Sequence, residues 1–327
     1  MEAKILGVGN ALVDVLVRIP SDDMLSEFGL PKGSMQLTDE KQQSEVYERV
    51  KDMKPQIVCG GSAANTICGL SKLGMNTGLI GKIGPNDLGK LYKSDLEANG
   101  VHSHLLGSET HTGSCISLIT PDSERTMVTC LGAAAELAES DIDERVFDGY
   151  THLYVEGYLV QNPGLIEKLY DIAKKKGMRT MIDLASYNVV EANIEFLQHL
   201  IGKYVDVVFA NEEEATAFTA AEDVDALNMM NEYADCVVLK QGRRGSLVKV
   251  GDEIVRVGIV NANSIDTTGA GDLYAAGFIY GQAQGYSAQK CAEIGAVTSG
   301  NVIEIVGTKM DAQRWANIRS KIKHITQ

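Results

Sequence analysis

The sequence has no long apolar segment and no cluster of basic residues. None of its apolar runs approaches the roughly 20 residues of a membrane-spanning helix, and its first residues lack a signal peptide's basic start. Lysine and arginine number 30 against 44 acidic residues, which gives a formal charge of −14. This charge repels nucleic acid and anionic membranes, and no Lys/Arg-rich run reverses it locally. We therefore expect a cytoplasmic protein that binds neither.

Several chemical motifs are missing or incomplete. The six cysteines lack C-x-x-C spacing, which is typical of reduced, partly buried thiols rather than of zinc ligands or disulfides. In the G-x-x-x-x-G-K string at Gly84–Lys90, Leu91 stands where a P-loop needs a hydroxyl, and Leu12 replaces the third glycine of a dinucleotide motif. There is no H-E-x-x-H or G-x-S-x-G. These absences disfavour P-loop NTPases, nicotinamide-dependent oxidoreductases and hydrolases.

Strand and helix patterns alternate through most of the chain and predict an α/β fold with a mainly parallel sheet. Arg179–Asp183 is predicted to be a strand, and the β-branched runs at Val205–Ala210 and Cys236–Lys240 are long enough for strands and too short for helices. Asn162 and Pro163 provide a helix cap and a first-turn proline. With 327 residues, the chain is long enough for one large domain plus a smaller piece, or for two domains.

Two regions lack the long helices of the rest of the chain. Ala11–Ile19 and Gly113–Met127 alternate apolar and polar residues between turn signals, which predicts a small β-sheet lid. A late hairpin is also predicted, with Gly251 and Asp252 at its turn. The predicted domains are a large α/β catalytic and nucleotide-binding domain at 1–10, 46–106 and 133–327, and a lid at 11–45 and 107–132.

The segment Asp266–Asp272 (DTTGAGD) carries the strongest chemical signal. Its small residues Gly269, Ala270 and Gly271 let an anion approach backbone amides at the start of a predicted helix. Asp272 lies inside the first helical turn, where its carboxylate could accept a proton from an attacking hydroxyl. The alternative is a glycine-rich turn in which Asp272 only complements the helix dipole.

A second motif, Gly60-Gly61-Ser62-Ala63-Ala64-Asn65, precedes another helical pattern. The paired glycines allow a sugar to lie against the backbone, Ser62 is suited to cap the helix, and Asn65 offers a donor and an acceptor to hydroxyls. Read alone, this string also fits a capped core helix.

Together, these motifs resemble the two signatures of the PfkB (ribokinase-like) family, and the resemblance extends over essentially the whole chain. It implies a three-layer α/β/α fold with a small β-sheet lid and an ATP-dependent kinase activity. It also implies that Gly269, Ala270 and Gly271 form the anion hole for the transferred phosphate and that Asp272 is the catalytic base.

Other segments are similar to adenosine kinases in particular, namely Gly9–Asp14 and Glu27–Leu37. The resemblance implies that Asp14, assisted by Asn10, binds ribose hydroxyls, and that Arg125 reaches the phosphates when the lid closes. Gly60, Gly61 and Asn65 would complete the acceptor site, and a base would contact lid residues such as Leu12, Leu16 and Met35. Surface or core positions are the alternative for all of these side chains.

The resemblance also assigns residues to the nucleotide. Asn211 and Glu214 match an N-x-x-E motif that would hold Mg²⁺ through water, although an acidic helix start explains them equally well. Lys240, Gly242 and Gly245 match the nucleotide-side turn, but the family more often has a small hydroxyl residue where Lys240 stands. Asn301 falls near the adenine contact. The resemblance further implies activation by a monovalent cation such as K⁺ near Asp266 and Thr268, which the sequence by itself does not show.

We therefore expect a PfkB-family kinase that transfers the γ-phosphoryl group of ATP to a primary hydroxyl of a nucleoside or sugar, with adenosine favoured. A kinase for ribose or another sugar and a non-catalytic nucleoside or nucleotide sensor are the alternatives. Both a monomer and a homodimer are compatible with the sequence.

Overall fold

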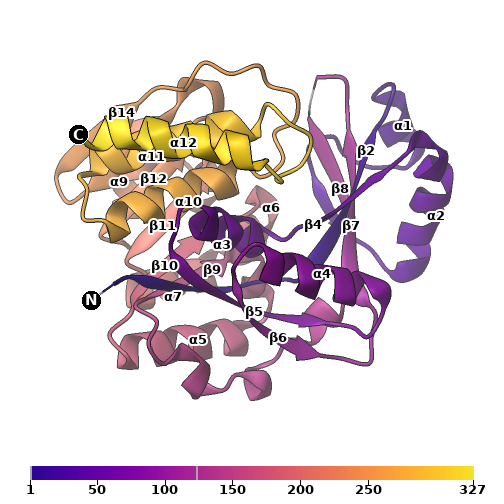
Figure 1. Cartoon of the computed structure of the whole chain (residues 1–327), viewed down its shortest axis with the longest axis horizontal. Helices are drawn as coiled ribbons and strands as arrows, with labels where there is room; N and C mark the ends of the chain where they lie inside the picture. Colours follow the sequence, from indigo (N-terminus) through magenta and orange to yellow (C-terminus); the bar gives the residue numbers. More distant parts are fainter. Residues whose placement is uncertain (1, 123) are drawn as a thin grey trace.

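Two sheets form the framework of the protein, which is represented by a computed structural model describing residues 2–122 and 124–327 (Figure 1). The larger sheet has nine strands in the order β14-β13-β12-β11-β10-β9-β1-β5-β6. Its strands are β1 (Lys4–Val8), β5 (Asn76–Ile83), β6 (His102–Gly107), β9 (His152–Glu156), β10 (Arg179–Asp183), β11 (Val207–Asn211), β12 (Cys236–Lys240), β13 (Ser246–Val250) and β14 (Glu253–Val257). Neighbouring strands are parallel except in the pairs β12–β13 and β13–β14.

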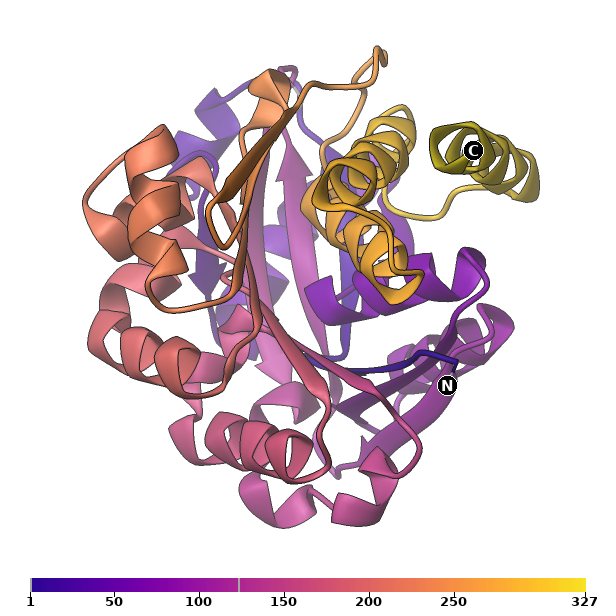
Figure 2. The ribbon, with the colours of Figure 1, turned by 90° about the vertical axis from the view of Figure 1, so that its left-hand side faces the viewer.

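Helices cover both faces of this sheet (Figure 2). One face packs against α5 (Pro163–Lys175), α6 (Tyr187–Ala192), α7 (Ile194–Tyr204), α8 (Glu212–Thr219) and α9 (Asp223–Asn231). The other packs against α3 (Ser62–Lys72), α4 (Asp87–Ala98), α10 (Ala270–Ala283) and α11 (Ala288–Val302), while α12 (Ala312–Thr326) lies against α11. Along β9, Leu153 and Val155 enter the first core and Tyr154 the second, as strand alternation requires. The predicted three-layer α/β/α class is confirmed.

The smaller sheet has five strands in the order β3-β8-β7-β2-β4. They are β2 (Leu12–Arg18), β3 (Met35–Leu37), β4 (Gln56–Cys59), β7 (Thr112–Ile119) and β8 (Arg125–Gly132). Two helices, α1 (Asp23–Glu27) and α2 (Glu40–Val50), lie beside this sheet (Figure 1). Residues of β2, β7 and β8 form a separate core with Leu25 and Val50 from these helices. The small sheet therefore has its own apolar core.

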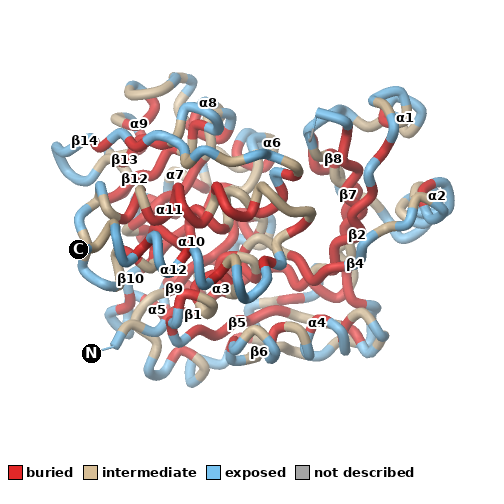
Figure 3. The backbone as a smooth tube through the Cα atoms, turned by 45° about the horizontal axis from the view of Figure 1, so that its top comes forward, coloured by how far each residue is buried: buried red, intermediate tan, exposed pale blue. Residues whose placement is uncertain are grey.

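Short 3₁₀ helices complete the described structure. They span Lys51–Met53, Ala133–Glu136, Glu139–Asp141, Glu144–Phe147, Gly157–Gln161 and Gly242–Arg244. Burial is concentrated in the strands of both sheets, whereas α1 and α2 present exposed surfaces (Figure 3). In residues 2–122 and 124–327, no helix is long and apolar enough to span a membrane.

The boundary of the small sheet differs from the sequence prediction. We expected residues 46–106 in the large domain, but β4 pairs antiparallel with β2, from Val13 opposite Cys59 to Leu16 opposite Gln56. Val50, the last residue of α2, also belongs to the core of the small sheet. This pairing joins segments about 40 residues apart in the chain, so no local pattern in Gln56–Cys59 could reveal it.

Candidate active site

A cavity of about 810 Å³ lies between the small sheet and the carboxyl ends of the large sheet's strands. Ligands bind at this edge in parallel α/β sheets because loops and helix N-termini gather there. The small sheet contributes alternate residues, such as Asp14, Cys115, Arg125 and Met127, while the side chains between them, such as Val15, pack toward α1 and α2. One face of the lid thus encloses the cavity.

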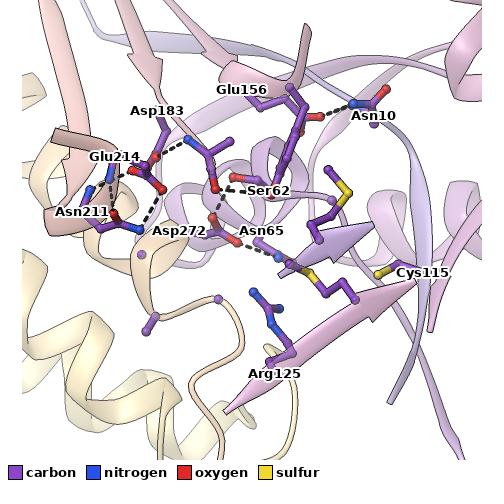
Figure 4. Close-up of a pocket in the computed structure, with 18 of the residues that line it drawn as sticks. Asn10, Ser62, Asn65, Cys115, Arg125, Glu156, Asp183, Asn211, Glu214 and Asp272 are labelled. Carbon is purple, nitrogen blue, oxygen red and sulfur yellow. Dashed lines mark hydrogen bonds between the residues drawn. The ribbon is translucent and has the colours of Figure 1, made fainter. Parts of the chain in front are cut away.

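Asp272 lies in the first turn of α10 and lines this cavity. Its Oδ1 accepts a hydrogen bond from Ser62 Oγ and its Oδ2 accepts one from Asn65 Nδ2, both at 2.8 Å (Figure 4). Burial raises the pKa of Asp272, while the bonds from Asn65 and Ser62 oppose that rise. These donors hold the carboxylate in one orientation with oxygen lone pairs still free.

The loop before Asp272 requires glycine. Gly269 caps α10 in the left-handed region with φ of 71°, and a Cβ there would lie 2.3 Å from Cγ2 of Thr308. The backbone amides that follow point out of the positive end of a 14-residue helix. Gly269, Ala270 and Gly271 all line the cavity, so an anion could approach their N–H groups beside Asp272.

Asn10 and the start of α3 are tied together by Glu156, at the end of β9. Glu156 Oε1 accepts from the Asn10 backbone N–H at 2.8 Å and from Asn10 Nδ2 at 2.6 Å, while Oε2 accepts from Ala63 N–H at 3.0 Å. Burial raises the pKa of Glu156 to about 7. The side-chain oxygen of Asn10 remains available to a ligand, because Glu156 holds only the amide nitrogen.

Asp14 faces the same part of the cavity from β2 and packs against Gly60, where an added Cβ would lie 2.1 Å from Asp14 Oδ2. Gly61 adopts φ of 91°, and a Cβ there would meet the Asn10 carbonyl oxygen at 2.4 Å. The glycine pair therefore allows the backbone to pass close to both polar residues. Burial raises the pKa of Asp14 to about 7, and the nearby Arg125 guanidinium opposes the rise.

Arg125 begins β8 and extends from the small sheet toward Asn65 and Asp272 (Figure 4). The guanidinium donates no hydrogen bond to another residue in the described parts of the chain, so its donors are available to an anion in the cavity. Asp14 contributes most to raising the pKa of Arg125 against the effect of burial. A cation from the small sheet thus faces the Asp272 carboxylate.

Adjacent strands of the large sheet end in polar residues. Asp183 ends β10, Asn211 ends β11 and Lys240 ends β12, and Lys240 Nζ donates to Asp183 Oδ2 at 2.7 Å. Asn211 and Glu214 form a reciprocal capping box at the start of α8, in which both Glu214 oxygens accept from Asn211. Burial raises the pKa of Glu214 to about 7, against the effect of Lys240.

The remaining wall of the cavity comes from the loops after β12 and β14 and from α11. Gly242, Gly245, Ile259, Ala296 and Ser299 line it. Ile259 is 59% exposed, which leaves an apolar side chain free to contact a ligand. Asn301, by contrast, does not line the cavity. Its Nδ2 donates to the Val297 carbonyl oxygen one turn back along α11.

A scan against family models matches residues 34–314 to the pfkB family of carbohydrate kinases. This match covers most of the chain. The protein belongs to the pfkB family.

Relatives of this pfkB kinase include adenosine and sugar kinases. The crystal structure of adenosine kinase from Sinorhizobium meliloti is 34% identical, with a TM-score of 0.93 over 98% of this chain and 100% of the other. A probable sugar kinase from Rhizobium etli is 30% identical, again with a TM-score of 0.93 over 98% of this chain and 100% of the other. An adenosine kinase from Dictyostelium discoideum is 27% identical over 94% of this chain and 97% of its own.

These similarities confirm the ribokinase-like fold and establish a pfkB-family phosphotransferase. A kinase of this family uses ATP as the phosphoryl donor. The candidate site of this enzyme lies where the small sheet meets the carboxyl ends of the parallel strands.

Several interactions differ from those expected of the individual residues. Ser62 does not cap α3, because Gly61 is the N-cap and the Ser62 hydroxyl donates to Asp272. Asn65 likewise donates to Asp272 and accepts from the Thr308 hydroxyl at 3.1 Å. Leu16 packs with Val58 and Ile119 beyond the cavity, whereas Leu12 and Met35 line it.

Glu156 was not predicted from the sequence, although it binds both Asn10 and the start of α3. Its only local signal is an acidic residue at the carboxyl end of a predicted strand, followed by glycine. Asp183 was missed for the same reason. A carboxylate at the carboxyl end of a parallel strand can therefore belong to a site even where no motif surrounds it.

Proposed function

We propose that this kinase transfers the γ-phosphoryl group of ATP to the primary hydroxyl of a nucleoside, with adenosine the favoured acceptor. The observation that carries the proposal is the position of Asp272. Its carboxylate is fixed by Ser62 and Asn65 and lies beside the cavity-lining loop of Gly269–Gly271. A base next to an anion-binding loop is the arrangement that phosphoryl transfer to an alcohol requires.

The reaction follows from this arrangement. Asn10 and Asp14 hold the acceptor's hydroxyls, so that its primary hydroxyl faces Asp272. As that oxygen forms a bond to the γ-phosphorus, Asp272 accepts the hydroxyl proton. The bond from the γ-phosphorus to the β–γ bridging oxygen breaks, and ADP leaves with the electron pair of that bond. Amides of Gly269–Gly271 and the Arg125 guanidinium stabilise negative charge on the phosphoryl oxygens.

The residues fit a magnesium ion that arrives with the nucleotide. In the described ranges, no group of three or more His, Cys, Asp and Glu residues forms a metal cage. Asn211 and Glu214 provide oxygen atoms of the kind Mg²⁺ prefers, and the capping box leaves them able to hold the ion through water. When bound, Mg²⁺ neutralises phosphate charge. A K⁺ site near Asp266 stays a prediction from the family resemblance.

Adenosine is favoured over a free sugar because the part of the cavity beyond Asp14 is apolar. Leu12, Met35, Met127, Leu131 and Leu137 line it. A flat base buries apolar area there that a free sugar would leave unfilled. The similarity to adenosine kinases also supports this choice. The similarity to a probable sugar kinase makes a sugar acceptor the second candidate.

An ADP-coupled assay with adenosine, inosine, guanosine, cytidine, ribose and fructose tests the acceptor. We expect adenosine to give the highest kcat/KM, and a free sugar that equals or exceeds it would contradict the proposal. Cytoplasmic location, the absence of nucleic-acid or membrane partners, and the choice between monomer and homodimer remain predictions from the sequence.

The role of Asp272 is tested by Asp272→Asn, which keeps the size of the side chain and removes the base. Turnover should fall by at least about 100-fold with ATP binding largely retained, since general-base catalysis contributes about that much. Asp87→Asn is the matched control, because Asp87 also lies in a first helical turn but is exposed and pairs with Lys90. Unchanged turnover in Asp272→Asn would remove Asp272 from the mechanism.

A further inference from the structure

Lys240 is a buried cation in the strand-end edge of the cavity. It ends β12 directly beside Asn211 of β11, and its side chain is 15% exposed. Lys240 Nζ donates a hydrogen bond at 2.7 Å to Asp183, whose side chain is 4% exposed. Both residues line the cavity. The ammonium is therefore shielded from bulk water but open to a ligand.

The ammonium of Lys240 has N–H donors that remain available to a ligand. A lysine ammonium carries three N–H donors, and within residues 2–122 and 124–327 its hydrogen-bond acceptor is Asp183 alone. A Cβ placed on Gly271 would lie 3.2 Å from Nζ, so the ammonium is next to the Gly269–Gly271 loop. An anion bound to the loop's amides would thus also be within reach of the lysine.

The burial of this ion pair does not by itself indicate a structural role. Burying two opposite charges costs desolvation free energy that their attraction often fails to recover, so such pairs are weak evidence for stability. Burial alone would lower the pKa of Lys240, but the nearby carboxylates of Asp183, Glu214 and Asp272 raise it. Those carboxylates keep the lysine charged, and a phosphate group is the anion this enzyme brings to it.

We infer that Lys240 is a further catalytic residue, whose ammonium donates to a non-bridging oxygen of the transferred phosphoryl group, and that Asp183 is the positioning residue that aims it. This inference rests on the proposed function. Lys240 approaches the phosphoryl group from the strand-end side and Arg125 from the lid, while Asp272 faces the acceptor. Two cations on different elements then offset the charge that develops as the phosphorus–oxygen bond to ADP breaks.

Two substitutions separate this role from simple neutralisation of Asp183. Lys240→Met removes the ammonium but leaves Asp183 buried without a partner. The double variant Lys240→Met with Asp183→Asn removes both charges, and thermal unfolding verifies that it folds. If Lys240 acts on the phosphate, kcat should fall by at least about 100-fold in both proteins. Recovery of near wild-type kcat in the double variant would show that the lysine only neutralises Asp183, which overturns the inference.

Rescue by an added amine gives an independent readout. In Lys240→Ala, added ethylammonium should raise kcat at least about tenfold in a saturable manner, because it can occupy the space of the missing side chain. Lys249→Ala is the matched control, because Lys249 lies on β13 away from the cavity and its Nζ donates to Asn228 at 2.7 Å. We expect this variant to keep the wild-type kcat and to show no response to the amine. Absence of any saturable rescue, in a protein that is folded and binds ATP, would also count against the inference.

The outcome can be distinguished from failure of the proposed function. If the wild-type enzyme forms no ADP with any acceptor tested, the proposed function fails before Lys240 is considered. A different result separates the two ideas. If the wild-type enzyme turns over while Asp272→Asn is inactive, and if Lys240→Met also retains wild-type kcat, then the proposed function survives and the role of Lys240 is refuted.

Discussion

The substitution Asn65→Leu should shift the pH dependence of the reaction, and the structure determines the direction of that shift. In the protein, Asn65 Nδ2 donates to Asp272 Oδ2 at 2.8 Å, and this bond stabilises the ionised carboxylate. Leucine has a similar size but no donor. Burial already raises the pKa of Asp272, so loss of the bond raises that pKa further.

The size of the effect follows from the bond that is lost. A hydrogen bond to a charged group contributes about 1.5–3 kcal/mol, and about 1.4 kcal/mol corresponds to a tenfold change in proton affinity. Asp272 in Asn65→Leu should therefore bind a proton about ten- to 100-fold more tightly. Since the base acts only when ionised, activity falls as pH decreases through its pKa, and this fall should begin at higher pH in the variant.

The assay is the pH profile of kcat/KM for the acceptor under saturating ATP. Its midpoint does not depend on the absolute rate, so weaker acceptor binding by the variant does not obscure it. Thr308→Val is the control, because it removes the bond to Asn65 Oδ1 and leaves the bond to Asp272 intact. If the low-pH midpoint of Asn65→Leu coincides with that of the wild type, Asn65 does not set the basicity of Asp272.

Two other carboxylates give further predictions. Because the folded-state pKa of Asp14 is raised from 3.8 to about 7, its contribution to stability is lost as pH rises between those values. Asp14→Asn should raise the Tm of the ligand-free protein at about pH 8 but not at about pH 4, and an equal gain at both would contradict the cause. Glu156→Gln should raise the acceptor KM about tenfold with a smaller change in kcat, since its amide would face one of the N–H donors of Asn10 or Ala63. An unchanged KM would rule out Glu156 as the anchor of Asn10.

Local sequence signals predicted much of the large sheet. The strands at Arg179–Asp183 and Cys236–Lys240 have the predicted bounds, and α5 begins at Pro163 with Asn162 as its cap. The hairpin of β13 and β14 also turns at Gly251 and Asp252. β-branched runs, helix caps and turn residues act within a few positions, so they can be recognised without knowing the fold.

The remaining features depend on contacts between distant parts of the chain. β4 belongs to the small sheet because it pairs with β2, and Ser62 donates to Asp272, 210 positions away in the sequence. The partnership of Lys240 with Asp183 joins the ends of two strands that have β11 between them. Neither residue's neighbours in the sequence carry information about such a pairing.

The path of the chain from the large sheet into the small one has a mechanical consequence. β1 ends at Val8 and β2 begins at Leu12, so the three residues between them, Gly9–Ala11, connect the two sheets and would be the pivot if the small sheet rotated about this connection. A rotation of the small sheet about this pivot would displace Asn10 least. Arg125, on β8, is separated from the pivot strand β2 by β7 and would swing through a wider arc. Asn10 would thus stay in contact with the acceptor while Arg125 moves toward or away from the cavity.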